Sequence, residues 1–217
     1  MPTWLQNPLR KFLVFFAGAY LLLLALGSWG GVGSAYKGMV HSFSDRMFGN
    51  WWSEGYVFVK DGKDPLNEGM DLAMHLVSRK QFAAAQANKT NVKTITVYQS
   101  TWQAGYLITA FFLALVVASP VPTRRKLWSA GIGLVVLTLY VLFRFWINID
   151  YSFQQNPVLD VVHHGEFMQS VMIFLDAFFM KNIVVSFIVP LLLWILITFQ
   201  KDDREEWVKL IRPQATA

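Results

Sequence analysis

Long apolar runs, separated by two extended polar segments, dominate the pattern along the chain. A helix needs about 20 mostly apolar residues to cross about 30 Å of hydrocarbon. Stretches close to that length predict four transmembrane helices, at residues 12–29, 104–119, 127–149 and 183–199. The second run is short, and Tyr98 and Trp102 extend it upstream and supply an aromatic anchor at the membrane surface. The pattern therefore predicts a mainly α integral membrane protein.

The basic residues beside these helices all favour one orientation. Lys and Arg gather in the cytoplasmic loops of membrane proteins, and here they lie at 10–11, in the turn 120–126 and in the tail 200–217. An even number of helices puts these three segments on one side, so both termini are predicted to be cytoplasmic. The first apolar run exceeds the usual core of a signal peptide, so we expect a membrane anchor there.

Residues 30–103 and 150–182 are then predicted to lie outside. In the first segment, "EGYVFVKDG" and "NVKTITVYQS" are rich in aromatic and β-branched residues and predict two short strands. Between them, Asp64 as N-cap and Pro65 after it begin an apolar repeat at helical spacing, which predicts a helix through about Ala87. Another helix is predicted upstream, ending near Trp51. Its apolar residues lie on one side, which suits the membrane interface: Tyr36, Met39, Val40, Phe43 and Met47. The result is a small α/β outer domain between the first and second transmembrane helices.

The composition agrees with a membrane protein and excludes several kinds of chemistry. Hydrophobic residues make up 54% of the chain and aromatic residues 16%, which is more than soluble domains carry. The net charge of +5 is explained by membrane orientation, so no nucleic-acid partner is predicted. The chain has no cysteine, which excludes disulfides, thiolate metal sites and cysteine nucleophiles. It also lacks the usual phosphate-binding, nucleophile-elbow and zinc-protease motifs.

The segment "DVVHHGEF" holds the candidate metal ligands Asp160, His163, His164 and Glu166. On a helix, Asp160 would face His164 and His163 would face Glu166, giving two pairs of an acid and an imidazole. A metal site needs three or four firmly held ligands. The favoured interpretation is a polar turn at the membrane surface whose histidines bond neighbouring carboxylates. A transition-metal or proton-handling site, or a contact with a partner, stays open as an alternative; otherwise no cofactor is predicted.

Two charges lie inside predicted apolar helices. Arg144 is near the outer end of the third transmembrane helix, and Asp176 lies in the apolar stretch before the fourth. A charge at the bilayer centre costs about 2.5–3.5 kcal/mol on insertion scales. Arg144 either extends outward to the headgroups or pairs with Asp176. The second arrangement is the hypothesis of an intramembrane ion pair that would fix the register of two helices, and the first stays open beside it.

One stretch suggests a family. "ASPVPTRRKLWSAGIGLVVLTLYVLFRFW", residues 118–146, has a proline-containing Arg-Arg turn that opens into a Leu/Val helix. It resembles small polytopic membrane proteins associated with bacterial exosortase systems. Exosortases themselves use a membrane-embedded cysteine, which this chain lacks, so it is not such a peptidase. The resemblance implies an accessory role in envelope protein sorting.

The sequence therefore predicts a non-enzymatic integral membrane subunit or scaffold of a larger complex, in the inner membrane of a bacterium. Its expected partners are the lipid bilayer and other membrane protein subunits. One alternative is a metal-dependent enzyme or sensor on the outer face that uses the histidine segment. A component of a lipid or small-molecule carrier is another alternative, and it would require a cavity between the helices.

Overall fold

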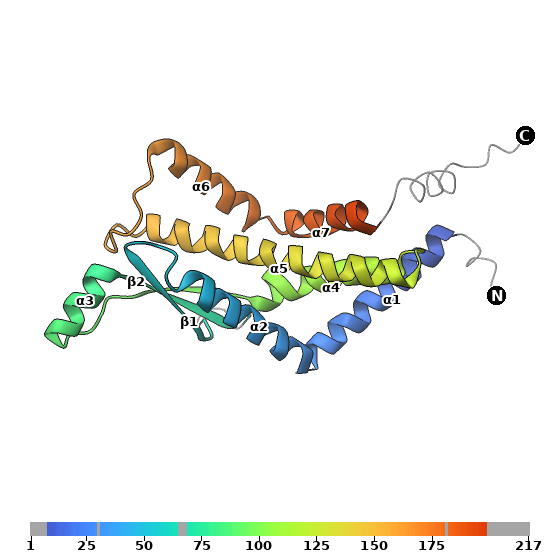
Figure 1. The fold of residues 1–217 in the computed structure, drawn as a ribbon, viewed down its shortest axis with the longest axis horizontal. Helices are drawn as coiled ribbons and strands as arrows, with labels where there is room; N and C mark the ends of the chain where they lie inside the picture. Colours follow the sequence, from blue (N-terminus) through green and yellow to red (C-terminus); the bar gives the residue numbers. More distant parts are fainter. Residues whose placement is uncertain (1–7, 30, 65–68, 181, 199–217) are drawn as a thin grey trace, which may run out of the picture.

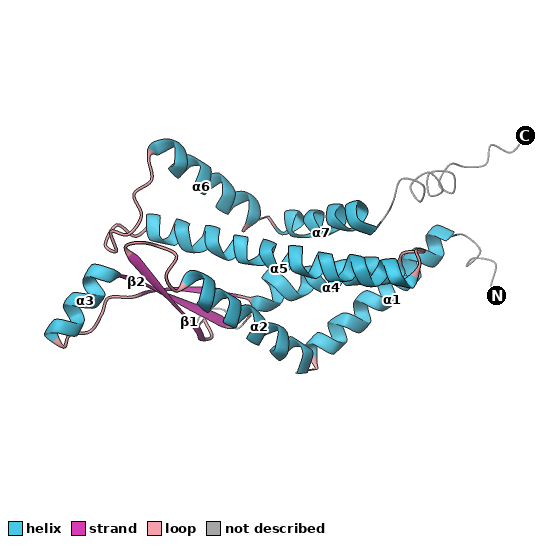
Figure 2. Ribbon diagram, in the orientation of Figure 1, coloured by secondary structure: helices cyan, strands magenta, loops and turns pink. Residues whose placement is uncertain are grey.

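The chain folds into an elongated molecule whose helices run mostly along its long axis (Figure 1). The computed structural model describes residues 8–29, 31–64, 69–180 and 182–198. Both ends of the described chain lie in one half of the molecule, and the strands lie in the other half (Figure 2). The predicted tail, 200–217, lies outside the described residues. In chain order, the elements are α1 (Pro8–Ser28), α2 (Gly31–Phe48), β1 (Gly55–Asp61), β2 (Leu72–Ser78), α3 (Arg79–Asn88), β3 (Ile95–Gln99), the π-helical turn η2 (Trp102–Tyr106), α4 (Leu107–Ala118), α5 (Thr123–Gln154), α6 (Glu166–Phe179) and α7 (Ile183–Thr198).

Two helices in the described part of the chain, α1 and α5, are long and apolar enough to cross a membrane. The pair α6 and α7 would count as a third span, but its two helices are bent by 81°. The second predicted span is a shorter apolar helix, Trp102–Ala118. By length and composition the structure therefore corrects four spans to two, or to three with the bent pair. The apolar runs are present, but the helices in two of them are short.

Helix α5 is longer than the span predicted at 127–149. Its 32 residues extend about 48 Å at ~1.5 Å per residue, well beyond about 30 Å of hydrocarbon. The predicted span ends before Asp150, but α5 continues past it to Gln154. The Asp150 carboxylate is accommodated there because it is buried and hydrogen-bonded to other segments. The outer end of α5 instead packs Phe145, Ile149 and Phe153 into the core of the outer domain. One helix thus belongs to both halves of the molecule.

The segment predicted to lie outside, residues 30–103, is called the outer domain below; it contains an antiparallel sheet in the order β1-β2-β3. Both predicted strands are confirmed as β1 and β3, but the predicted helix between them is wrong over residues 72–78, which form the central strand β2. Helix α3 begins only at Arg79. In β2 nearly every side chain is buried on both faces of the sheet, so the alternation typical of a strand is missing. Its apolar residues therefore matched a helical repeat.

The half of the molecule that contains α1, α4 and α7 is held together by aromatic side chains and close helix contacts. Phe111 of α4 packs edge to face against Phe16 and Tyr20 of α1 and against Phe187 of α7. Phe112 points the other way, into a buried cluster with α5. There it lies so close to Gly133 that any added Cβ would collide with its ring. Helix α4 is therefore enclosed by α1, α5 and α7.

Candidate functional site

Polar groups gather in two places that the sequence singles out: the loop before α6, and the region around Arg144 and Asp176. The loop residues 160–165 are not helical, and α6 begins at Glu166. The helical spacing assumed for the two acid–imidazole pairs is therefore wrong. Asp160 has a left-handed backbone with φ of 51°, which Asp tolerates better than most residues.

The two neighbouring histidines of this loop have different partners. His163 Nε2 lies 3.2 Å from Asp160 Oδ1, and the two side chains are 70% and 61% exposed. His164 turns inward, and its Nε2 lies 2.6 Å from Oδ2 of Asp150 on α5. One histidine of the pair is therefore on the surface, while the other anchors the loop to the long helix.

Asp150 is the centre of a buried polar contact that sequence analysis missed. Its side chain is 5% exposed. Its Oδ1 accepts a hydrogen bond of 3.0 Å from the indole Nε1 of Trp52, which precedes β1 and packs on Phe153. Its Oδ2 accepts the hydrogen bond from His164. The carboxylate thus joins α5, the segment before β1 and the loop before α6. The only sequence signal was an aspartate at the end of a predicted span.

The contact with Asp150 assigns the tautomer of the His164 imidazole. Since the carboxylate of Asp150 accepts, His164 Nε2 carries the hydrogen, and in the neutral ring Nδ1 is then the acceptor. A cavity of about 270 Å³ lies beside it, and its lining includes His163, Asp160 and Gln169. The described residues around this cavity provide imidazole, carboxylate and amide groups, with no hydroxyl or thiol nucleophile among them. The groups that line this cavity can donate and accept hydrogen bonds.

In the described part of the chain, the fold does not bring the candidate metal ligands together into a cluster. Within the described ranges, no group of three or more His, Asp or Glu side chains is arranged to hold a metal ion. Glu166 lies in the first turn of α6 and is exposed. A metal bound by Asp160, His163, His164 and Glu166 stays a prediction.

The other two histidines belong to the outer domain. His41 Nε2 lies 3.2 Å from the carbonyl oxygen of Val59. His75 Nδ1 lies 2.9 Å from Thr96 Oγ1, its cross-strand neighbour on β3. Burial, and secondly the positive charge of Lys60, lower the pKa of His75 below its ordinary value of 6.5. Both histidines therefore connect elements of the outer domain.

The second polar site is a cavity of about 340 Å³ where α5, η2, β3 and the junction of α6 and α7 meet. Arg144 and Asp176 both line it, with only 6% and 4% of their surface exposed. Arg144 Nη1 donates a 3.3 Å hydrogen bond to the carbonyl oxygen of Ala104 in the π turn, and the guanidinium lies 5.9 Å from the ring centre of Tyr140. The structure thus brings both predicted charges to one cavity, and their direct pairing stays a prediction.

The lining of this cavity is polar for a site between apolar helices. Gln99, Ser100 and Ser186 are buried there, and Asn148 lies on α5 beside Arg144. Ala104 belongs to a π-helical turn, a distortion that often occurs at functional sites. Sequence analysis found the two charges but not the amide and hydroxyl groups, because these come from distant segments.

Comparison of the chain with models of protein families, with curated proteins and with solved structures finds no match.

Proposed function

We propose that this chain is a membrane-integrated subunit or scaffold of a larger protein complex in a bacterial inner membrane, with its outer domain as the contact surface. The observation that carries the proposal is a strip of exposed apolar side chains that continues on the outer domain, beyond the part that lipid would cover. Large exposed apolar surfaces outside a membrane are typical of protein contacts.

The proposed membrane bundle consists of α1, η2 with α4, the first part of α5, and α7. These helices occupy the half of the molecule that also holds both ends of the described chain (Figure 1). Helix α4 is short but enclosed by its neighbours, so its ends meet protein as well as lipid. The side chains of Leu127 on α5 and Leu196 on α7 are exposed and apolar, which suits contact with lipid. Both termini are proposed to be cytoplasmic.

The strip lies on α2, which runs from the end of α1 along the sheet and away from the membrane half (Figure 1). One side of this helix is taken up by the core, where Val40 and Phe48 are buried. The adjoining side keeps Met39 and Phe43 exposed, at 37% and 50%. Trp51, just beyond the helix, is 55% exposed. The single apolar face expected for this helix is therefore only partly used within the chain.

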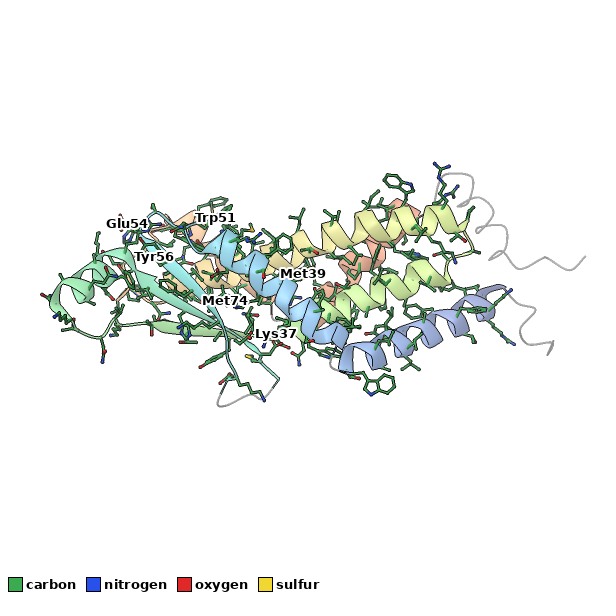
Figure 3. All side chains as sticks on the ribbon, turned by 60° about the horizontal axis from the view of Figure 1, so that its bottom comes forward. Lys37, Met39, Trp51, Glu54, Tyr56 and Met74 are labelled. Atoms are coloured by element: carbon green, nitrogen blue, oxygen red, sulfur yellow. The ribbon has the colours of Figure 1, made fainter. Side chains whose placement is uncertain are left out.

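Figure 3 shows Met39 on α2 and Trp51 close to the end of that helix, at two levels of the outer domain. Aromatic residues and methionine are enriched at protein interfaces, where they supply large contact areas. The resemblance of residues 118–146 to exosortase-associated proteins suggests the setting. We propose that the subunit serves envelope protein sorting through a membrane protein bound along this strip.

The test is site-specific photo-crosslinking in bacterial cells. A photoreactive phenylalanine analogue replaces Phe43 or Trp51, and the matched control replaces Gln86, which is exposed on α3. The expected result is a crosslink to one and the same second membrane protein from both strip positions and none to it from position 86. Crosslinks only to lipid, together with a lone monomer by native mass spectrometry in mild detergent, would overturn the proposal.

A further inference from the structure

The cavity around Arg144 lies at the level where a membrane meets the outer solvent. Arg144 is 21 residues beyond the first residue of α5, Thr123, which corresponds to about 32 Å at ~1.5 Å per residue. The hydrocarbon core is about 30 Å thick. With Thr123 at the inner boundary, Arg144 is therefore at the height of the outer headgroups. The junction of α6 and α7, whose Met180 and Ile183 line the cavity, is at the same level.

Two polar atoms at this cavity have no hydrogen-bond partner among the described residues. One is Arg144 Nε, a donor, and the other is the side-chain Oδ1 of Asn148, an acceptor one helical turn further along α5. Both atoms are buried. Leaving a buried polar group unsatisfied is costly, and most such groups in proteins are bonded to protein, water or ligand. An unused donor and an unused acceptor on two residues that line one cavity point to a ligand that has both functions.

The charges at the cavity narrow the chemistry of that ligand. A guanidinium and a carboxylate, from Arg144 and Asp176, line it together. The lining therefore already carries both signs, and a ligand with a net charge would add uncompensated charge to a buried site, which is costly. A zwitterion adds no net charge, and it can offer an acceptor to Arg144 Nε and a donor to Asn148 Oδ1.

We propose that this cavity binds the headgroup of a phospholipid that carries a primary ammonium, such as phosphatidylethanolamine. The phosphate accepts a hydrogen bond from Arg144 Nε, while the ammonium donates one to Asn148 Oδ1. A volume of about 340 Å³ is enough for roughly ten waters at ~30 Å³ each, which is ample for a phosphate and a two-carbon amine. Ile183 lines the cavity and is 69% exposed, so acyl chains would leave along α7.

This inference rests on the membrane placement proposed above but not on any partner protein. The full chain is purified in mild detergent and incubated with phosphatidylethanolamine, phosphatidylcholine or phosphatidylglycerol of matched acyl chains. Native mass spectrometry then measures the bound lipid. Phosphatidylcholine keeps the phosphate but has no N–H donor, and phosphatidylglycerol has no ammonium. We expect at least a fivefold preference for phosphatidylethanolamine over both.

Variants assign the preference to this cavity. Asn148→Leu keeps both charges and removes the acceptor, so the preference over phosphatidylcholine is expected to fall below twofold. Arg144→Gln is expected to lose at least tenfold in affinity for all three lipids. The matched control is Lys126→Gln, which removes a cation at the opposite end of α5 and is expected to change nothing. Should Arg144→Gln fail to fold, Asn148→Leu still decides.

Several results would overturn the inference. These are equal retention of phosphatidylethanolamine and phosphatidylcholine, an unchanged preference in Asn148→Leu, and an equal loss in Lys126→Gln. Displacement by soluble glycerophosphoethanolamine at the same concentration as the lipid would assign the site to a free zwitterion instead. Extraction of the native protein by alkaline carbonate would contradict the membrane placement itself. Failure of the proposed function is recognised separately, by the crosslinking experiment.

Discussion

The imidazole Nε2 of His164 lies 2.6 Å from the carboxylate of Asp150, although 14 residues separate them in the chain. The same carboxylate accepts the indole N–H of Trp52, 98 residues away. Three segments that are far apart in the sequence therefore meet at one buried carboxylate. Because the outer end of α5 carries that charge, the loop before α6 and the segment before β1 are both held to the same helix.

The two adjacent histidines are expected to differ sharply in their effect on stability. His164→Leu leaves the buried carboxylate of Asp150 with one partner fewer, and hydrogen bonds to charged groups contribute about 1.5–3 kcal/mol. His163→Leu removes only an exposed pair with Asp160, which is worth about 0–1 kcal/mol. Thermal denaturation in one detergent compares the variants with the parent protein. Equal losses of stability would contradict the buried contact.

Substitutions at two glycines of α5 test how closely this helix packs against α4. Gly133→Ala would force its new methyl group into the ring of Phe112, and overpacking costs about 1–3 kcal/mol. At Gly131 nothing lies within 4 Å of an added Cβ, so Gly131→Ala is expected to be neutral or stabilising by up to about 1 kcal/mol. The melting temperatures of both variants measure this contrast. Phe112→Leu combined with Gly133→Ala should recover part of the loss, and a tolerated Gly133→Ala would contradict the close approach.

The sequence predicted parts of the fold from local patterns and missed parts that depend on distant contacts. The strands β1 and β3 have a local signature, whereas β2 is buried on both faces and carries none. The apolar side predicted for the helix at α2 includes Val40, which is buried, but also Met39 and Phe43, which stay exposed. Which side of an amphipathic helix meets the core depends on the elements that pack against it, and those are not visible in the helix itself.

The candidate site was predictable to a similar degree. The histidine segment and the charges of Arg144 and Asp176 were found, because charged groups beside apolar runs are conspicuous. Asp150 stands just after the span predicted at 127–149, and nothing local shows that α5 continues into the outer domain. The polar lining around Arg144 comes from β3, η2 and α7. Only the three-dimensional arrangement brings those segments together.

His75 predicts an acid-sensitive outer domain. Its pKa is lowered in the folded state by burial and by Lys60, so the unfolded chain binds a proton more readily. Its contribution to stability is present above the unfolded value of about 6.5 and is lost as the pH falls from there through the lowered folded pKa. The difference in melting temperature between the parent and His75→Gln should therefore shift in favour of the variant on acidification. When His75→Gln is introduced into the Lys60→Gln variant, the shift should be smaller, because loss of the Lys60 charge brings the pKa of His75 closer to 6.5. A difference in melting temperature that does not depend on pH would contradict the mechanism.

The absence of cysteine makes the proposed orientation easy to test. Single cysteines at Gln86, in the outer domain, and Thr123, at the start of α5, are both exposed positions. In intact cells whose outer face is accessible, a membrane-impermeant maleimide should label Gln86→Cys and leave Thr123→Cys unlabelled until the membrane is opened. The parent chain gives the background. Labelling of position 123 before position 86 would reverse the orientation.

Helix α5 runs without a break from the bundle into the core of the sheet domain, and this continuity makes it a lever. A membrane helix adjusts its tilt to the thickness of the bilayer. A tilt of about 10° about one end of a rod of about 48 Å displaces the other end by roughly 8 Å. Because Phe153 and Asp150 fasten the sheet and the histidine loop to that end, they would travel with it. In the proposed membrane placement, a change in the surrounding lipid would therefore displace the sheet and the histidine loop together.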